Sequence, residues 1–195
     1  TGLTLEETIA RILDDRLDFS TRRLYARRLA HVGSPEAIAA LLKVFRTAPP
    51  QHKAFMAQLI GSTGDPAAKA LLWPLLNDPD ERVALAAIRG LSFVGTPEVS
   101  AKLAELLADP RRSQAIRTEA ALGLGDIGDD GARDALVGAF DKVPDEEVAT
   151  QILNGLGKFP FPQISELFSQ YLAAPDTPAE MRIVTVEALA NSSAE

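Results

Sequence analysis

Residues 79–98 read PDERVALAAIRGLSFVGTPE and hold the pattern that decides the fold. An alanine- and leucine-rich stretch of strong helix formers ends at Gly95, a residue type that closes helices because it adopts the left-handed conformation without a side-chain penalty. Thr96 then has a side-chain oxygen that can accept an orphan amide bond of the next helix, and Pro97 suits the first helical position. The stretch therefore predicts a helix, a tight turn and the start of a second helix.

The same phrase recurs about every 31 to 33 residues along the chain. It stands at Val32-Gly33-Ser34-Pro35, Thr63-Gly64-Asp65-Pro66 and Ile127-Gly128-Asp129-Asp130, and in degenerate form at Phe159-Pro160-Phe161-Pro162. A second set of turns, each containing proline and most containing aspartate, lies between these phrases at 48–50, 78–80, 108–110, 143–145 and 174–176. Each repeat is therefore predicted to contain two helices, and a period of this size indicates a stacked array.

Apolar residues follow each glycine with helical spacing. Positions four, eight, eleven and twelve after it are Ala37, Leu41, Val44, Phe45; Ala68, Leu72, Leu75, Leu76; Val99, Leu103, Leu106, Leu107; and Ala132, Leu136, Ala139, Phe140. This spacing forms one core-facing stripe of an amphipathic helix. The prediction is a single array over 1–195: a capping helix within 1–19, repeats at 20–48, 49–78, 79–109, 110–143 and 144–174, and a half-repeat at 175–195. The capping helix begins at the capping box Thr4-Leu5-Glu6-Glu7 and ends near Asp15.

The repeat pattern resembles the HEAT repeat family, most closely the short bacterial repeats also found in phycobilin lyases. Residues 79–98 match from Asp80 and Val83 through Ala86, Ala87, Leu91 and Gly95. Residues 109–132 match through Ile116-Arg117, Ala120, Ala121, Leu124, Gly125 and Gly128. The resemblance implies an all-α fold, a right-handed solenoid of stacked antiparallel helix pairs. It says little about activity, because solenoids serve as general binding surfaces.

The resemblance also implies a role for one arginine in each repeat, eleven residues before the turn glycine, which ties neighbouring repeats together through turn aspartates. The aligned positions are Arg22, Lys53, Ala84, Arg117, Ala149 and Arg182. The alanines at two of them break a continuous arginine–aspartate ladder. After Arg182 no complete repeat follows, so the array either ends in a lone helix or belongs to a longer solenoid, and the second alternative is slightly favoured.

No catalytic or metal-binding constellation emerges from the residues. Gly123-Leu124-Gly125-Asp126-Ile127-Gly128 spells a dinucleotide fingerprint, but it is predicted to end a helix, whereas the fingerprint requires a preceding strand. Asp126, Asp129, Asp130 and Asp134 do not have EF-hand spacing and are interpreted as helix caps. The two histidines, His31 and His52, form no zinc motif, and the His-Glu pairs of the HEAT-repeat deoxyhypusine hydroxylases are missing. We therefore expect no catalytic residues, metal or cofactor.

The remaining candidate is a binding surface. In the resembling family the second helix of each repeat lines the concave face, and the predicted partner-binding residues there are Leu42, Lys43, Arg46, Lys69, Trp73 and Arg133. Trp73 is the only tryptophan, and tryptophan is a favoured interface anchor. A packing role in the groove between helices is an equal alternative. Pro74 removes a backbone donor and predicts a kink beside it.

Charge is distributed unevenly over a chain with a net charge of −7. Residues 118–195 contain 4 Lys/Arg and 14 Asp/Glu, whereas residues 1–50 contain 8 and 6. The densest basic cluster, Arg22, Arg23, Arg27 and Arg28, is interpreted as a solvated helix face, because the acidic balance argues against a nucleic-acid groove. No apolar run is long enough to span a bilayer. The absence of cysteine is compatible with the cytoplasm, which is slightly favoured, or with the periplasm if a signal peptide was removed.

These features predict a non-catalytic interaction or scaffolding module that holds a protein or peptide on its concave face. A phycobilin-lyase-like or other enzyme-associated HEAT protein is the alternative, and nucleic-acid binding through the Arg-rich N-terminal helix ranks third. Phe159 and Phe161 are expected to be exposed, and they serve either as a second contact or, as we prefer, as an apolar plug that replaces the missing glycine turn. The oligomeric state and the identity of the partner stay open.

Overall fold

The computed structural model confirms the predicted all-α fold of helix pairs, because every element it describes is a helix. It describes residues 2–18, 21–22, 24–25, 28, 36–37, 39, 45, 50–62, 64, 66–140 and 142–192. Within these residues no helix is long and apolar enough to cross a membrane. The chain divides into two compact units, residues 1–94 and residues 95–195.

In its described residues, unit 1 contains α1, three further α-helices and a 3₁₀ helix that directly follows one of them. Its described elements are α1 (Leu5–Leu13), α4 (Pro50–Gly61), α5 (Pro66–Leu72), the 3₁₀ helix η1 (Trp73–Asn77) and α6 (Glu81–Val94). Contacts join α4 to α5 and to α6, and α6 also contacts α5 and η1. As predicted, Thr4 and Glu7 form a reciprocal capping box at the start of α1.

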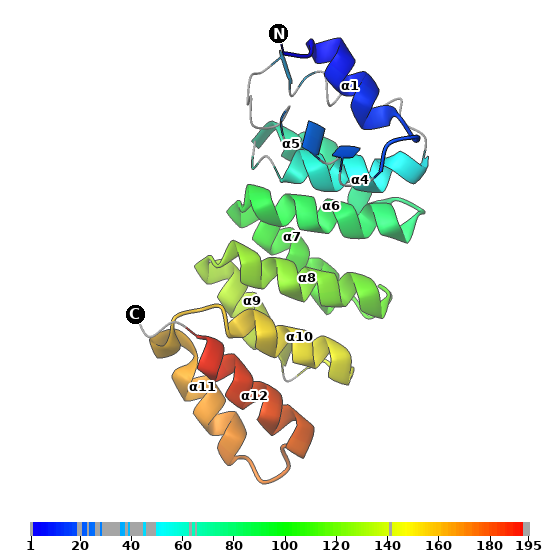
Figure 1. The fold of residues 1–195 in the computed structure, drawn as a ribbon. Coiled ribbons are helices and arrows are strands. Elements are labelled where there is room, and N and C mark those ends of the chain that lie inside the picture. Colours follow the sequence, from blue (N-terminus) through cyan, green and yellow to red (C-terminus); the bar gives the residue numbers. More distant parts are fainter. Residues whose placement is uncertain are drawn as a thin grey trace. The chain divides into compact units, whose positions relative to one another are not determined.

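Unit 2 stacks first and second helices of successive repeats (Figure 1). Its elements are α7 (Pro97–Ala108), α8 (Gln114–Ile127), α9 (Asp130–Phe140), α10 (Glu146–Leu156), α11 (Phe161–Ala173) and α12 (Ala179–Asn191). In one layer α8 contacts α10 and α10 contacts α12, while in the other α7 contacts α9. An edge-to-face pair of Phe140 and Tyr171, with ring centroids 4.6 Å apart, joins α9 to α11.

The predicted core stripe is buried at most of the positions that the structure describes. Val99, Leu103, Leu106 and Leu107 are each at most 2% exposed. In the other repeats the positions four and twelve residues after the glycine are also buried, from Ala37 at 2% to Phe140 at 5%. Leu41 and Val44 lie outside the described residues. Only the position eleven residues after the glycine, Leu75 and Ala139, is half-buried in two repeats.

The turn glycines behave as predicted, but one of the predicted caps does not. Gly64, Gly95 and Gly128 have φ values of +66°, +57° and +69°, the left-handed region in which only glycine avoids strain. Thr96 precedes Pro97 at the start of α7, yet its hydroxyl caps no amide, and its Oγ1 is buried without a hydrogen-bond partner among the described residues. The prediction that Thr96 caps this helix was therefore wrong. Gly33, Ser34 and Asp65 lie outside the described residues.

Glycines inside the first helices of the repeats allow backbones to touch. A Cβ atom built on Gly61 of α4 would lie 1.9 Å from Cα of Gly90 in α6. In unit 2 a Cβ atom on Gly125 of α8 would lie 2.7 Å from Cα of Gly155 in α10. Real Cβ atoms do not approach other atoms so closely, so these crossings exist only because the residues are glycines.

The degenerate turn at 159–162 separates its two phenylalanines. Phe159 is 2% exposed and packs into the core of unit 2, whereas Phe161 at the start of α11 is 46% exposed. The expectation that both are exposed was wrong for Phe159. The burial of this ring agrees with the plug interpretation for Phe159 alone.

Candidate functional site

The predicted anchor Trp73 lies at a break in the second helix of its repeat. α5 ends at Leu72, and a 3₁₀ helix with Pro74 in its first turn begins at Trp73, as the missing amide of proline predicts. Buried Leu72 and Leu76 flank the indole, which is itself half-buried. The Lys69 ammonium lies 5.7 Å from the centroid of the Trp73 ring, within cation–π range. Lys69 and Trp73 thus form one amphipathic patch, here called the Trp73 patch.

The other predicted binding residues do not form a described cluster with Trp73. Leu42, Lys43 and Arg46 lie outside the described residues. Arg133, on α9 in unit 2, donates to Asp130 and Asp134 at 2.8 Å each. The hydrogen bond to Asp134 is the main cause that raises the pKa of Arg133. Its charge is therefore already compensated within its own helix.

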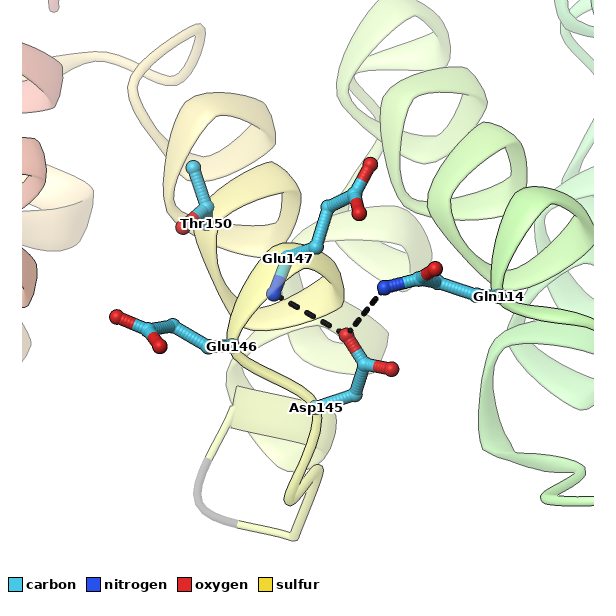
Figure 2. A pocket seen from close by; sticks show the side chains of 5 residues that line it. All are labelled: Gln114, Asp145, Glu146, Glu147 and Thr150. Atoms are coloured by element: carbon cyan, nitrogen blue, oxygen red, sulfur yellow. Dashed lines mark hydrogen bonds between the residues drawn. The ribbon is translucent and has the colours of Figure 1, made fainter.

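The structure shows an acidic pocket that the sequence analysis did not identify. It is an open depression of about 560 Å³ lined by Gln114, Asp145, Glu146, Glu147 and Thr150. Figure 2 shows Gln114 of α8 reaching across to Asp145 at the start of α10. The sequence feature that indicates this pocket is the run of three carboxylates that begins 31 residues after Gln114. Only the packing of α8 on α10 brings these carboxylates close to Gln114.

Asp145 is held in its ionised form by donors on both sides. Its Oδ1 accepts the amides of Glu147 and Val148 at 3.1 Å each and Gln114 Nε2 at 3.0 Å. The Val148 amide, followed by the Gln114 side chain, lowers the pKa of Asp145 below its ordinary value. Glu146 and Glu147 beside it are exposed. Chemically the pocket offers acceptors for a basic side chain rather than a tuned pair of acid and base.

The motifs that resembled enzyme sites have structural roles. The Gly123–Gly128 segment ends α8, as predicted, with Gly128 as the left-handed cap. Asp129 caps α9 through the Ala132 amide at 2.7 Å and accepts from Ser100 at 2.8 Å. Asp126 pairs with Lys158. In the described part of the chain, no group of three His, Asp or Glu side chains has an arrangement suited to a metal ion.

Where the repeat position is an arginine, its guanidinium group binds backbone carbonyl groups rather than turn aspartates alone. Arg117 Nε donates to the carbonyl of Leu107 at 3.0 Å, and Arg22 Nε donates to that of Ile12 at 2.8 Å. Arg182 donates to Ala174 and Thr177 in the same manner. These guanidinium groups satisfy orphan carbonyls near the end of the preceding helix. The aspartate link is secondary: the charge of Arg117 makes the smallest contribution to lowering the pKa of Asp145.

The N-terminal basic cluster is partly used inside unit 1. The Arg22 side chain is 14% exposed, lies 3.4 Å from Asp15 and stacks 5.7 Å from the ring centroid of Phe55. His52, predicted to bind no metal, contacts Asp15 at 2.7 Å. Arg23, Arg27 and His31 lie outside the described residues. Arg22 is therefore placed for packing rather than for a phosphate.

Three turns share a clasp that the sequence analysis also missed, an aspartate that binds the arginine two residues later. Asp14 and Arg16, Asp80 and Arg82, and Asp109 and Arg111 form these Asp–x–Arg clasps. In each, one carboxylate oxygen accepts both the arginine amide and Nε, and the other accepts Nη2. The arginine side-chain hydrogen bond lowers the pKa of Asp14 to about 2 and also lowers the pKa values of Asp80 and Asp109.

Comparison with known families agrees with this geometry of paired helices and glycine turns. The model for HEAT repeats matches residues 39–116, and the model for PBS lyase HEAT-like repeats matches residues 116–158. The chain belongs to the HEAT repeat family. The two matches adjoin at Ile116 and together span more than half of the chain. No curated protein matches it.

Solved HEAT-like structures support the fold of this HEAT-repeat chain. An engineered protein is similar at a TM-score of 0.53 and 22% identity, over 97% of this chain and 96% of that one. The complex of CpcE and CpcF of phycocyanin lyase from Nostoc sp. PCC7120 is similar at a TM-score of 0.57 and 24% identity, over 96% of this chain and 76% of that one. At these identities the likeness concerns the fold alone.

Proposed function

We propose that this HEAT-repeat chain is a non-catalytic binding module that holds a protein or peptide segment, with the Trp73 patch as an anchor on the face lined by second helices. The observation that carries the proposal is the half-buried indole at the α5 break with a lysine ammonium beside it. Such a residue offers a partner a large apolar area and an N–H donor.

The polar surface of unit 2 supports a binding role over a catalytic one. The carboxylates of the acidic pocket stabilise the start of α10 and can accept basic groups, but no described nucleophile is paired with a base there. A basic residue of a partner would complement the carboxylates of the acidic pocket. Complementary charge of this kind contributes to specificity and to the rate of association.

The experiment is affinity capture from the source organism's lysate with quantitative mass spectrometry. Wild type is compared with Trp73→Ala and with Phe93→Ala, a control that removes a 61%-exposed aromatic ring from the same unit. Circular dichroism establishes that all three baits are folded. We expect specific partners to be lost with Trp73→Ala and retained with Phe93→Ala. Equal recovery with both variants would assign Trp73 a packing role and contradict the proposed anchor.

A lyase-associated role is the second candidate, favoured by the PBS lyase HEAT-like match over residues 116–158 and by the likeness to the phycocyanin lyase complex. In that role the array binds a bilin or a bilin-bearing protein. Mixing the folded chain with a free bilin and recording the visible absorption spectrum tests it. A saturable spectral shift supports the lyase-associated role, and an unchanged spectrum together with partner capture favours the simple binding module.

A further inference from the structure

An exposed aromatic ring marks the start of α11. Phe161 is the first residue of this helix and is 46% exposed, and Pro160 and Pro162 lie on either side of it. Proline fixes the φ angle of its own residue, so the backbone around Phe161 has few conformations. A restrained backbone loses little conformational entropy when the side chain that it carries contacts a partner.

The register of the repeats explains why this ring is exposed. The residues that open the second helices of unit 2 are Pro97 in α7, Asp130 in α9 and Phe161 in α11. Pro97 and Asp130 are also exposed, although another helix of the same layer follows each of them. α7 contacts α9, and Phe140 of α9 packs on Tyr171 of α11. The exposure of Phe161 therefore follows from its place at a helix start, and the proline and aspartate at the equivalent places show that the fold requires no ring there.

Carboxylates of α9 lie near the start of α11. Arg133 Nη1 donates to Asp130 at 2.8 Å and to Gln163 at 3.4 Å, so it joins the first turns of the two helices. Arg133 Nη2 donates to Asp134 at 2.8 Å. The Asp130 and Asp134 side chains are nonetheless 85% and 70% exposed, and two carboxylates share one guanidinium group, which leaves a net negative charge. We call Phe161, Asp130 and Asp134 the Phe161 patch.

An aromatic ring near exposed carboxylates suits an arginine side chain. A guanidinium group stacks on an aromatic face and can donate two hydrogen bonds to one carboxylate, whereas a lysine ammonium is a strongly hydrated point charge. An apolar side chain beside that arginine would remove more of the ring from water. The charge of the whole unit favours the same partner, because residues 95–195 contain 17 Asp/Glu and 8 Lys/Arg.

We propose that the Phe161 patch binds an arginine-bearing segment of a partner protein. The guanidinium group stacks on the Phe161 ring and pairs with a carboxylate of α9, and an apolar side chain of the same segment contacts the ring. The proposal does not depend on the Trp73 patch, which belongs to unit 1 and shares no residue with the Phe161 patch.

The test titrates the full chain with short blocked peptides and follows its backbone amides by NMR. The probe is acetyl-Leu-Arg-Leu-Arg-amide, and the matched peptide has lysine in place of both arginines. With the arginine peptide we expect saturable shifts of the amide signals of residues 130–134 and 161–163, and with the lysine peptide we expect weaker binding. Shifts confined to other parts of the chain, or equal binding of the two peptides, would overturn the proposal.

Variants of the patch locate the binding. Phe161→Ala should weaken binding of the arginine peptide about threefold to fivefold, the loss expected for one exposed cation–π contact. The double variant Asp130→Asn, Asp134→Asn should also weaken it, more at low salt than at high salt. Phe93→Ala removes another exposed ring and Glu147→Gln removes an exposed carboxylate of the acidic pocket. These two variants are the matched controls and should bind like wild type.

Circular dichroism checks that each variant is folded, as expected because every substituted side chain is exposed. Unchanged binding by Phe161→Ala overturns the proposal. Equal weakening by Glu147→Gln also overturns it, because the peptide would then respond to the negative charge of unit 2 as a whole. Self-association in sedimentation equilibrium that Phe161→Ala abolishes has the same consequence, since a second copy of the chain would then cover the patch.

Discussion

In unit 1, α4 crosses α6 with Gly61 against Gly90, and in unit 2, α8 crosses α10 with Gly125 against Gly155. The crossings use the same positions of the repeat and the same absence of a side chain. The surfaces around them differ, because residues 1–94 contain 12 Lys/Arg and 10 Asp/Glu whereas residues 95–195 contain 8 and 17. The close contact between backbones therefore depends on glycines at fixed positions of the repeat. The surface charge around the contact differs between the two units.

The turn that follows α10 differs from the turns that follow α4 and α8, which end at the left-handed glycines Gly64 and Gly128. After α4 the chain turns at Gly64 with a φ of +66°, and after α10 it turns through Lys158, Phe159 and Pro160 without a left-handed glycine. After α10 the buried Phe159 ring holds the turn in place, whereas after α4 the left-handed backbone of Gly64 makes the turn. One architecture therefore tolerates two ways of closing a helix pair, one local and one that depends on core packing.

The largest effect should come from removing the closure that Phe159 provides after α10. Phe159→Ala deletes a ring that is 2% exposed and should lower the free energy of unfolding by about 3 to 5 kcal/mol, through lost burial and the cavity left behind. Phe161→Ala, at a 46%-exposed ring in the same turn, should change it by less than about 0.5 kcal/mol. Urea denaturation followed by circular dichroism measures both. Equal effects would contradict the plug role of Phe159.

Adding one methyl group at each glycine crossing tests whether the two crossings are equivalent. Gly61→Ala and Gly125→Ala should each lower the free energy of unfolding by about 1 to 3 kcal/mol, because a backbone must move away from the new Cβ atom. The loss should be larger for Gly61, where the contact would be 1.9 Å rather than 2.7 Å. Thermal denaturation of the two variants under one set of conditions gives the ranking.

Gly138→Ala is the control for these substitutions. It lies within α9, and no atom would come within 4 Å of its Cβ. Alanine there should raise the free energy of unfolding by about 0.5 to 1 kcal/mol through helix propensity alone. If Gly61→Ala and Gly125→Ala stabilise the protein as Gly138→Ala does, the helices at the two glycine crossings can move apart without loss of stability.

A smaller effect is expected where two successive turns use different caps. Thr96→Val replaces a buried hydroxyl that has no partner in the described part of the chain, and should raise the free energy of unfolding by about 1 kcal/mol. Asp129→Ala removes the cap of α9 and the acceptor of Ser100, and should lower it by about 1 kcal/mol. Chemical denaturation measures the free energy of unfolding of both variants. A lower value for Thr96→Val than for wild type would show that the Thr96 hydroxyl has a hydrogen-bond partner.

The smallest effects concern acid titration of one aspartate in each unit. The Arg16 clasp lowers the pKa of Asp14 from 3.8 to about 2, and the Val148 amide and Gln114 lower that of Asp145. Because both pKa values are lower in the folded state, each carboxylate stabilises the fold above pH 4, and this contribution is lost as the pH falls through the folded-state pKa. Both side chains are half-buried at the surface, where solvent screens their charges, so the change in stability is small.

Carboxyl-detected NMR titration separates the two aspartates. Arg16→Gln should raise the pKa of Asp14 toward 3.8, because the hydrogen bonds from Arg16 cause the lowered value. The pKa of Asp145 should stay unchanged in this variant. Gln114→Ala should raise the pKa of Asp145 and leave that of Asp14 unchanged. A shift of both aspartates in either variant would mean that long-range charge, rather than local hydrogen bonding, controls them.

Much of the fold followed from local patterns in the sequence. The left-handed conformation at Gly95 and Gly128, the break beside Pro74 and the capping box at Thr4 each depend on a few neighbouring residues. The burial of the stripe at Val99, Leu103 and their equivalents follows from helical periodicity. The candidate site was only partly predictable: Trp73 was noticed as a residue type, whereas the acidic pocket requires α8 and α10 to be side by side.

The sequence by itself determined that this is an array of helix pairs, because backbone conformation and the faces of each helix are encoded by residues a few positions apart. The tertiary structure alone decided which residues each long side chain contacts, and which backbone packs against each glycine. Arg117 reaches a carbonyl of the preceding helix, Phe159 turns into the core while Phe161 remains outside, and Gly155 serves to admit Gly125. Such contacts join residues of different helices, and their outcome depends on how closely the two backbones approach.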